Sequence, residues 1–110
     1  MDKSWKAWER RVAALLGGVR RGADTRSRNG AGKTDVIHDE LAIECKLLGR
    51  PGFADCLSAA KQAETNAESG LPIAVVQRKG RRWQDALVVM RLETFVEARN
   101  VEARNELQKG

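Results

Sequence analysis

Hydrophobic and polar positions follow a helical period at the start of this chain. Apolar side chains between residues 4 and 16 recur on one side of a helical wheel, with Ser4 as the predicted N-cap and Gly17-Gly18 as the stop. The predicted apolar arc consists of Trp5, Trp8, Val12, Leu15 and Leu16. Glu9 falls at the edge of this arc, where its carboxylate needs a cation, a metal or a route to solvent because burying it unpaired is costly. On this position alone, a surface Glu9 paired with a nearby arginine is the favoured interpretation.

Alternation with a period of two then predicts a hairpin. The segments TDVIH (34–38) and LAIECK (41–46) are separated by only two residues, as in a tight turn between antiparallel strands. In the second strand, alternation sends two residues to the core and two to the opposite, exposed face: Ile43 and Cys45 inside, Glu44 and Lys46 outside. An exposed Glu-x-Lys pair is common on strands, so it gains meaning only from its neighbours.

The second half of the chain predicts a helix, two strands and a last helix. Residues 54–69 have a helical stripe of small side chains, and residues 73–78 and 83–90 are rich in strand-forming residues. The run ALVVM lacks alternation and predicts a strand that is covered on both faces. Thr94 and Glu97 have the spacing of a capping box that opens the last helix. The small-residue stripe consists of Cys56, Leu57, Ala60, Ala63 and Ala67.

The order α-β-β-α-β-β-α predicts an α/β fold, a small mixed β-sheet flanked by helices. The 110 residues suffice for one domain, 1–110, with a tail at about 106–110 that we expect to fray. No run approaches the ~20 apolar residues that span a bilayer. Charged residues crowd the first eleven positions, where a secretory signal needs an apolar run. We therefore expect a cytoplasmic protein without a membrane partner.

Cysteine and histidine are too scarce for a structural zinc site. Two cysteines, Cys45 and Cys56, accompany a single histidine, whereas such a site needs four ligands. Reduced thiols are expected rather than a disulfide, because no secretion signal is present. His38 lies near the predicted hairpin turn and is interpreted as a surface residue. Metal chemistry would therefore depend on oxygen ligands.

The net charge of +5 is concentrated in the glycine-rich segment 17–34, which predicts a mobile basic loop. Five cations stand there against Asp24 alone, a net +4: Arg20, Arg21, Arg26, Arg28 and Lys33. Such a patch fits nucleic acid, whose phosphates bind cations and release counterions. A solvated loop with idle arginines is the alternative. Because these five cations lie on one flexible segment just before the acidic residue Asp35, we favour DNA binding.

The segment NGAGKTDV (29–36) looks like the end of a nucleotide-binding loop but fails its requirements. Ser27 stands where that loop needs a glycine, and β-branched residues follow where it needs a helix. We therefore expect no nucleotide cofactor. What remains is Asp35 at the start of a strand.

Asp35, Glu44 and Lys46 together have the residue types that phosphodiester hydrolysis requires. Two carboxylates on adjacent strands can hold Mg²⁺, for which Mn²⁺ can substitute, with waters at its other positions. The metal polarises a phosphate oxygen and lowers the pKa of a bound water. A lysine beside it can orient or deprotonate that water. The sequence thus predicts a metal-dependent nuclease.

An ordered set of four residues resembles the motif of the PD-(D/E)xK nuclease superfamily: Glu9 on a helix, then Asp35, Glu44 and Lys46 on a hairpin. The resemblance covers residues 5–92. Together with the basic loop around Ser27, these residues make the chain similar to one branch of this superfamily, the archaeal-type Holliday junction resolvases, which also occur in phage. This implies a restriction-endonuclease-like core. It also implies a Mg²⁺-dependent endonuclease, a hydrolase of DNA recombination that resolves four-way junctions by paired symmetrical nicks.

Position by position, the resemblance implies a role for six residues: metal ligation by Asp35 and Glu44 with Glu9 in support, water activation by Lys46, and catalytic support from Ser27 and Gln62. The DNA contacts that the loop would make come from Arg20, Arg21, Arg26, Ser27, Arg28 and Lys33. Thr34 stands where the motif usually has proline. Proline only stiffens the start of the strand, so this departure weakens the resemblance more than the chemistry.

Resolvases of this kind are homodimers, because two sites related by a two-fold axis can nick two strands together. The candidate interface consists of residues 87–90, Leu92, Phe95 and Val96, which could equally fill a monomeric core. Two alternatives stay open for the function: another nicking or restriction-like nuclease of this superfamily, and a DNA-binding module that does not cut. The intact acidic set and the small size favour a nuclease that reads DNA shape.

Overall fold

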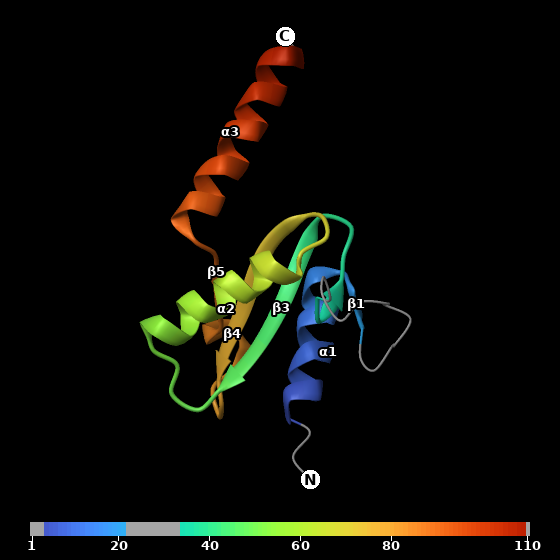
Figure 1. Cartoon of the computed structure of the whole chain (residues 1–110). Helices are drawn as coiled ribbons and strands as arrows, with labels where there is room; N and C mark the ends of the chain where they lie inside the picture. The colour runs from blue at the N-terminus through green and yellow to red at the C-terminus, as the bar shows by residue number, and fades with distance from the viewer. Residues whose placement is uncertain (1–3, 22–33, 110) are drawn as a thin grey trace.

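The computed structural model describes residues 4–21 and 34–109, which form a mixed α/β fold (Figure 1). Its elements are α1 (Ser4–Leu16), β1 (Val19–Arg20), β2 (Val36–Ile37), β3 (Leu41–Leu48), α2 (Phe53–Asn66), β4 (Leu71–Arg78), a 3₁₀ turn (Trp83–Asp85), β5 (Leu87–Val89) and α3 (Leu92–Lys109). The predicted mixed sheet flanked by helices is confirmed. Of the helices described, none is long and apolar enough to cross a membrane.

The sheet has the strand order β1-β2-β3-β4-β5. β3 and β4 are its long central strands and run parallel, joined by α2, whereas all other neighbours are antiparallel. The predicted hairpin is present as β2 and β3. β1 was not predicted, since it is only two residues long and lies inside the segment expected to be a loop. It extends the sheet by pairing with β2.

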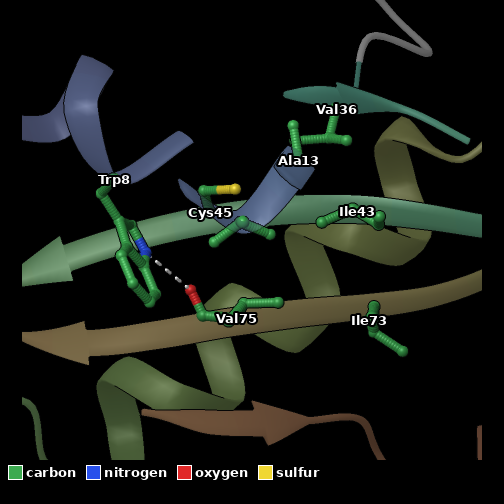
Figure 2. Close-up of a cluster of buried hydrophobic side chains, with 8 residues drawn as sticks. Trp8, Ala13, Val36, Ile43, Cys45, Ile73 and Val75 are labelled. Atoms are coloured by element: carbon green, nitrogen blue, oxygen red, sulfur yellow. Dashed lines mark hydrogen bonds between the residues drawn. The ribbon is translucent and has the colours of Figure 1, made fainter. Parts of the chain in front are cut away.

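The two faces of the sheet carry different helices, as the alternation of β3 and β4 requires. On one face, Trp8 and Val12 of α1 pack against Ile43 and Val75 (Figure 2). On the other face, the small side chains of α2 approach the sheet closely, with Ala59 in contact with the second cluster around β4. The buried stripe of α2 is Ala59, Ala60 and Ala63. It shares Ala60 and Ala63 with the predicted stripe and adds Ala59, while the other predicted members are only half-buried.

The end of α1 is joined to the hairpin. Gly17 adopts a φ of 77°, which closes the helix, and the N–H of Gly18 donates to the carbonyl of Ala13 at 2.9 Å. Nδ1 of His38 accepts two backbone N–H groups, so Nε2 is the protonated nitrogen that donates to the carbonyl of Leu16 at 2.9 Å. His38 is therefore half-buried and structural, and not the surface residue expected.

Two predictions about apolar residues were wrong. Trp5 and Leu15 are about half exposed, because the buried face of α1 is turned toward Ala13. Leu87 and Val88 are 58% and 60% exposed. β5 is therefore an edge strand with open apolar side chains, and not a strand covered on both faces.

α3 begins at Leu92, two residues before the predicted start, and projects away from the sheet (Figure 1). Thr94 does not cap it, since its hydroxyl donates to Oε2 of Glu64 on α2 at 2.7 Å. Arg91 also donates to both carboxylate oxygens of Glu64. These contacts attach the base of α3 to α2. The helix continues to Lys109, through residues where fraying was expected.

Candidate active site

The hairpin brings the carboxyl groups of Asp35 and Glu44 together. Asp35 precedes β2, and its backbone N–H donates to the carbonyl of Ile43 at 3.0 Å. Its side-chain Oδ2 accepts the backbone N–H of Cys45 at 2.8 Å, which fixes the carboxylate against the edge of β3. The carboxyl group of Glu44 on β3 lies close enough to that of Asp35 for Asp35 to raise the pKa of Glu44. Two acidic residues nine positions apart in sequence therefore share one site.

Glu44 is buried, with only 2% of its surface exposed. The prediction that it lies on an exposed face was wrong, because α2 covers that face of the sheet. Nδ2 of Asn66, the last residue of α2, donates to its Oε1 at 2.8 Å. Burial raises the pKa of Glu44 to about 7; the charge of Asp35 adds to this rise, while Asn66 and the charge of Lys46 oppose it. At neutral pH this carboxyl group therefore exists in both protonation states.

Lys46 follows Glu44 on the same face of β3 and is half-buried. Cys45, between them, points into the core beside α1 (Figure 2). Burial raises the pKa of its thiol, and the negative charges of Asp35, Glu9 and Glu44 raise it further. Cys45 therefore stays a neutral packing residue, as expected, and it forms no disulfide.

Glu9 approaches this pair from α1. It is 8% exposed, so the expected surface location was wrong, whereas the expected pairing with a nearby arginine is present. Its Oε1 accepts a hydrogen bond from Nε of Arg20 on β1 at 2.8 Å. Burial raises the pKa of Glu9, the charge of Asp35 raises it further, and Arg20 lowers it. Glu9 is therefore close enough for the charge of Asp35 to affect its pKa, but its carboxylate forms an ion pair with Arg20.

Arg21 and Thr34 stabilise the start of the hairpin. Nε of Arg21 donates to the carbonyl of Thr34 at 2.7 Å, and its backbone N–H donates to the carbonyl of Asp35 at 3.0 Å. The hydroxyl of Thr34 donates to the carbonyl of Val36 at 3.1 Å. These bonds restrain the position where the superfamily motif usually has proline.

The expected DNA-binding residues divide into two groups. Arg20 and Arg21 make the internal contacts just described, with Glu9 and Thr34. The others lie outside the described residues: Arg26, Ser27, Arg28 and Lys33. Their roles stay predictions from the sequence.

Gln62 is exposed on α2, and Asn66 one turn later is the residue that contacts Glu44. Sequence reasoning did not identify Asn66. Positions four apart lie on the same face of a helix, so the amide next in line after Gln62 was the available signal.

The donor set of this site fits a hard divalent cation. Across residues 4–21 and 34–109, no group of three or more His, Cys, Asp or Glu side chains is arranged to hold a metal ion. Asp35 and Glu44 nevertheless bring two carboxyl groups close enough to interact electrostatically. One or two carboxylates, completed by water and substrate phosphate, are the usual protein ligands of Mg²⁺. The carboxyl groups of Asp35 and Glu44 thus fit Mg²⁺, whereas the carboxylate of Glu9 is paired with Arg20.

Comparison of the chain with protein-family models, curated proteins and solved structures found no match. The resemblance to the PD-(D/E)xK superfamily therefore stays a prediction from the motif residues. Among the described residues, the proximity of the carboxyl groups of Asp35 and Glu44 is the feature that best indicates a function.

Proposed function

We propose that this protein is a Mg²⁺-dependent, structure-selective DNA endonuclease that resolves four-way junctions. One observation carries the proposal: the hairpin brings the carboxyl groups of Asp35 and Glu44 close enough to interact, with Lys46 on the same strand as Glu44. Other parts of the chain supply what DNA cleavage needs. The net charge of +5 attracts phosphates, and the segment that holds most of it adjoins Asp35 in sequence.

Asp35 and Glu44 would hold the cation, and each is preorganised by the fold. The N–H of Cys45 fixes the Asp35 carboxylate, and Asn66 orients Glu44 and favours its charged form. When bound, Mg²⁺ would polarise the scissile phosphate and lower the pKa of a water molecule. Burial of Glu44 excludes bulk water from one side of the pair.

Lys46 would bind or orient the attacking water and the scissile phosphate, because its side chain shares a face with Glu44. A cation there offsets the negative charge that develops on the phosphate. Glu9 would act indirectly: by engaging Arg20, it keeps a positive charge beside the carboxylates without becoming a ligand. The same pair attaches α1 to β1.

A second copy of the chain would complete the enzyme. Exposed apolar side chains on β5 and α3 offer a surface for a homodimer: Leu87, Val88, Leu92, Phe95 and Val96. Two-fold symmetry would present two cleavage sites to two strands of a junction.

The test is a cleavage assay with a labelled four-way junction, beside a linear duplex with the same arm sequences, in Mg²⁺. Paired symmetrical nicks in the junction alone are the expected result. Equal cleavage of both substrates would instead identify a nuclease without junction preference. Binding of both with no cleavage in Mg²⁺ or Mn²⁺ would contradict the enzymatic proposal and favour a DNA-binding module.

A further inference from the structure

A small pocket lies on the α1 face of the sheet, away from the carboxylates. Its volume is about 290 Å³, and it is lined by Trp8, Arg11, Gln77, Arg81, Arg82 and Trp83. None of the residues assigned to the candidate active site lines it. It combines aromatic rings, cations and one buried amide, and neither the fold nor the proposed cleavage chemistry explains why these meet.

Gln77, near the end of β4, is 5% exposed, and only one of its two side-chain amide atoms has a hydrogen-bond partner among the described residues. Its Nε2 donates to the carbonyl of Arg81 at 2.8 Å. Because a carbonyl can only accept, this bond fixes the amide orientation and turns Oε1 away from Arg81. Oε1 is buried and, among the described residues, has no hydrogen-bond partner. Buried polar atoms without partners are rare, so this oxygen can accept an N–H donor that the described residues do not supply.

Two indole rings border the pocket. Trp8 is 6% exposed and is held in place by a 3.4 Å hydrogen bond from Nε1 to the carbonyl of Val75 (Figure 2). Trp83 belongs to the 3₁₀ turn and is 41% exposed. The partly open indole of Trp83, in the same pocket as the unpaired acceptor, is a surface on which a flat ring can stack.

The cations of the pocket suit an anionic group on the same ligand. Arg11 and Arg81 are exposed, and within the described part of the chain their side chains form no hydrogen bond or ion pair. Arg82 is engaged by Asp85 at 3.1 Å. Two arginines are therefore available at the rim. The combination fits a flat ring with an N–H donor and an attached phosphate.

We propose that this pocket binds one unpaired nucleotide of DNA. The base stacks on Trp83 and donates an N–H to Oε1 of Gln77, and its phosphate binds Arg11 and Arg81. Every DNA base has an N–H group on its pairing edge, which is free only when the base is unpaired. A base inside a duplex is also stacked on both sides and cannot enter a pocket. The site therefore selects single-stranded DNA over duplex.

This inference rests on the DNA-binding part of the proposed function and is independent of cleavage. It can be tested with a short labelled single strand of mixed sequence and with its duplex, by fluorescence anisotropy in the presence of a chelator. We expect Trp83→Ala to weaken single-strand binding by ~5- to ~150-fold, the range for loss of one stacked base, and to leave duplex binding unchanged.

The matched control is Trp5→Ala, which removes an indole that is 50% exposed on α1 and lies outside the pocket. It should bind the single strand as the wild type does. Gln77→Met keeps the approximate length of the side chain but removes both Oε1 and the Nε2 donor to the carbonyl of Arg81, and it should weaken single-strand binding in the same direction. Thermal unfolding followed by circular dichroism checks that each variant is folded.

Single-strand binding by Trp83→Ala equal to that of Trp5→Ala would overturn the inference, as would equal losses for single strand and duplex. Either result leaves junction cleavage by the wild type intact, so the proposed function would stand. If the wild type bound none of the three DNAs, the single strand, the duplex and the junction, both this inference and the proposed function would be overturned.

Discussion

Asn66, the last residue of α2, donates a 2.8 Å hydrogen bond to Oε1 of Glu44 in the middle of β3. The bond joins residues 22 positions apart and ties the end of a helix to the candidate metal ligand. It favours the charged form of Glu44 while burial opposes that form. Burial and Asn66 are the two largest influences on the pKa of Glu44, which is about 7.

Replacing Asn66 with Ala should raise the pKa of Glu44 further, because the buried carboxylate loses a charge-stabilising donor. Such bonds contribute ~1.5–3 kcal/mol, so we expect the alkaline shift of the pH–rate profile to be about one to two pH units. Cleavage of a labelled junction across pH measures it. Asn100→Ala, on the exposed side of α3, is the control and should leave the profile unmoved. The same profile for Asn66→Ala and wild type would refute this role.

Glu44 should also make folding depend on pH. Its pKa in the folded chain, about 7, lies above the ordinary value of 4.5, so the folded protein binds more protons between these values. The free energy of unfolding then falls as pH rises through this window and is highest below it. Glu44→Gln cannot ionise and should be more stable than wild type at pH 8, by on the order of 1–3 kcal/mol, while losing cleavage.

Urea unfolding in the presence of a chelator, at pH 5 and pH 8, measures the difference. The difference in the free energy of unfolding between Glu44→Gln and wild type should become smaller toward pH 5, where Glu44 of the wild type is protonated. Glu97→Gln, at an exposed position of α3, should show neither effect. A Glu44→Gln variant that is less stable than wild type at pH 8 would count against the burial argument.

The Arg20–Glu9 pair should contribute to stability as a unit. Arg20→Gln leaves the Glu9 carboxylate buried without its partner. The expected loss is ~2 kcal/mol, below the ~3–5 kcal/mol of fully buried pairs because the Arg20 side chain is 20% exposed. Removing both charges in Glu9→Gln/Arg20→Gln should recover most of the loss. Arg10→Gln, an exposed change on α1, is the control, and a double variant no better than Arg20→Gln would contradict the coupling.

The exposed apolar face of α3 should carry the proposed dimer. Phe95 is 49% exposed, and a Glu at this position would put a charge into the interface. Burying a phenylalanine is worth ~1.5–3 kcal/mol, so Phe95→Glu should weaken dimerisation at least ~10-fold. Sedimentation velocity measures the assembly. Val101→Glu, 43% exposed on another side of the helical wheel, is the matched control. Dimerisation of Phe95→Glu as strong as that of Val101→Glu would place the interface elsewhere.

The sequence predicted the hairpin, and with it the proximity of Asp35 and Glu44, because both depend on local patterns. Asp35 and Glu44 flank one tight turn, so the pairing of two neighbouring strands is enough to bring their side chains close together. α1 was predicted for the same reason, since its apolar period and Gly17-Gly18 lie within one segment.

The remaining features depend on tertiary contacts that no local pattern contains. Glu44 is buried because α2 crosses its face of the sheet, and Asn66 reaches it only through that crossing. The run at β5 was expected to be covered on both faces, but α3 points away and leaves Leu87 exposed. β1 is too short to show a period, and it forms because Arg20 reaches Glu9 while its backbone pairs with β2.

The most direct test of the central claim is to compare Asp35→Asn with wild type in binding and cleavage of a four-way junction in Mg²⁺. Asparagine keeps an oxygen that can accept the N–H of Cys45 but removes the charge that a cation requires. The account predicts cleavage reduced to background with junction affinity kept. Cleavage at the wild-type rate would show that Asp35 is no metal ligand, and the proposed active site would then be wrong.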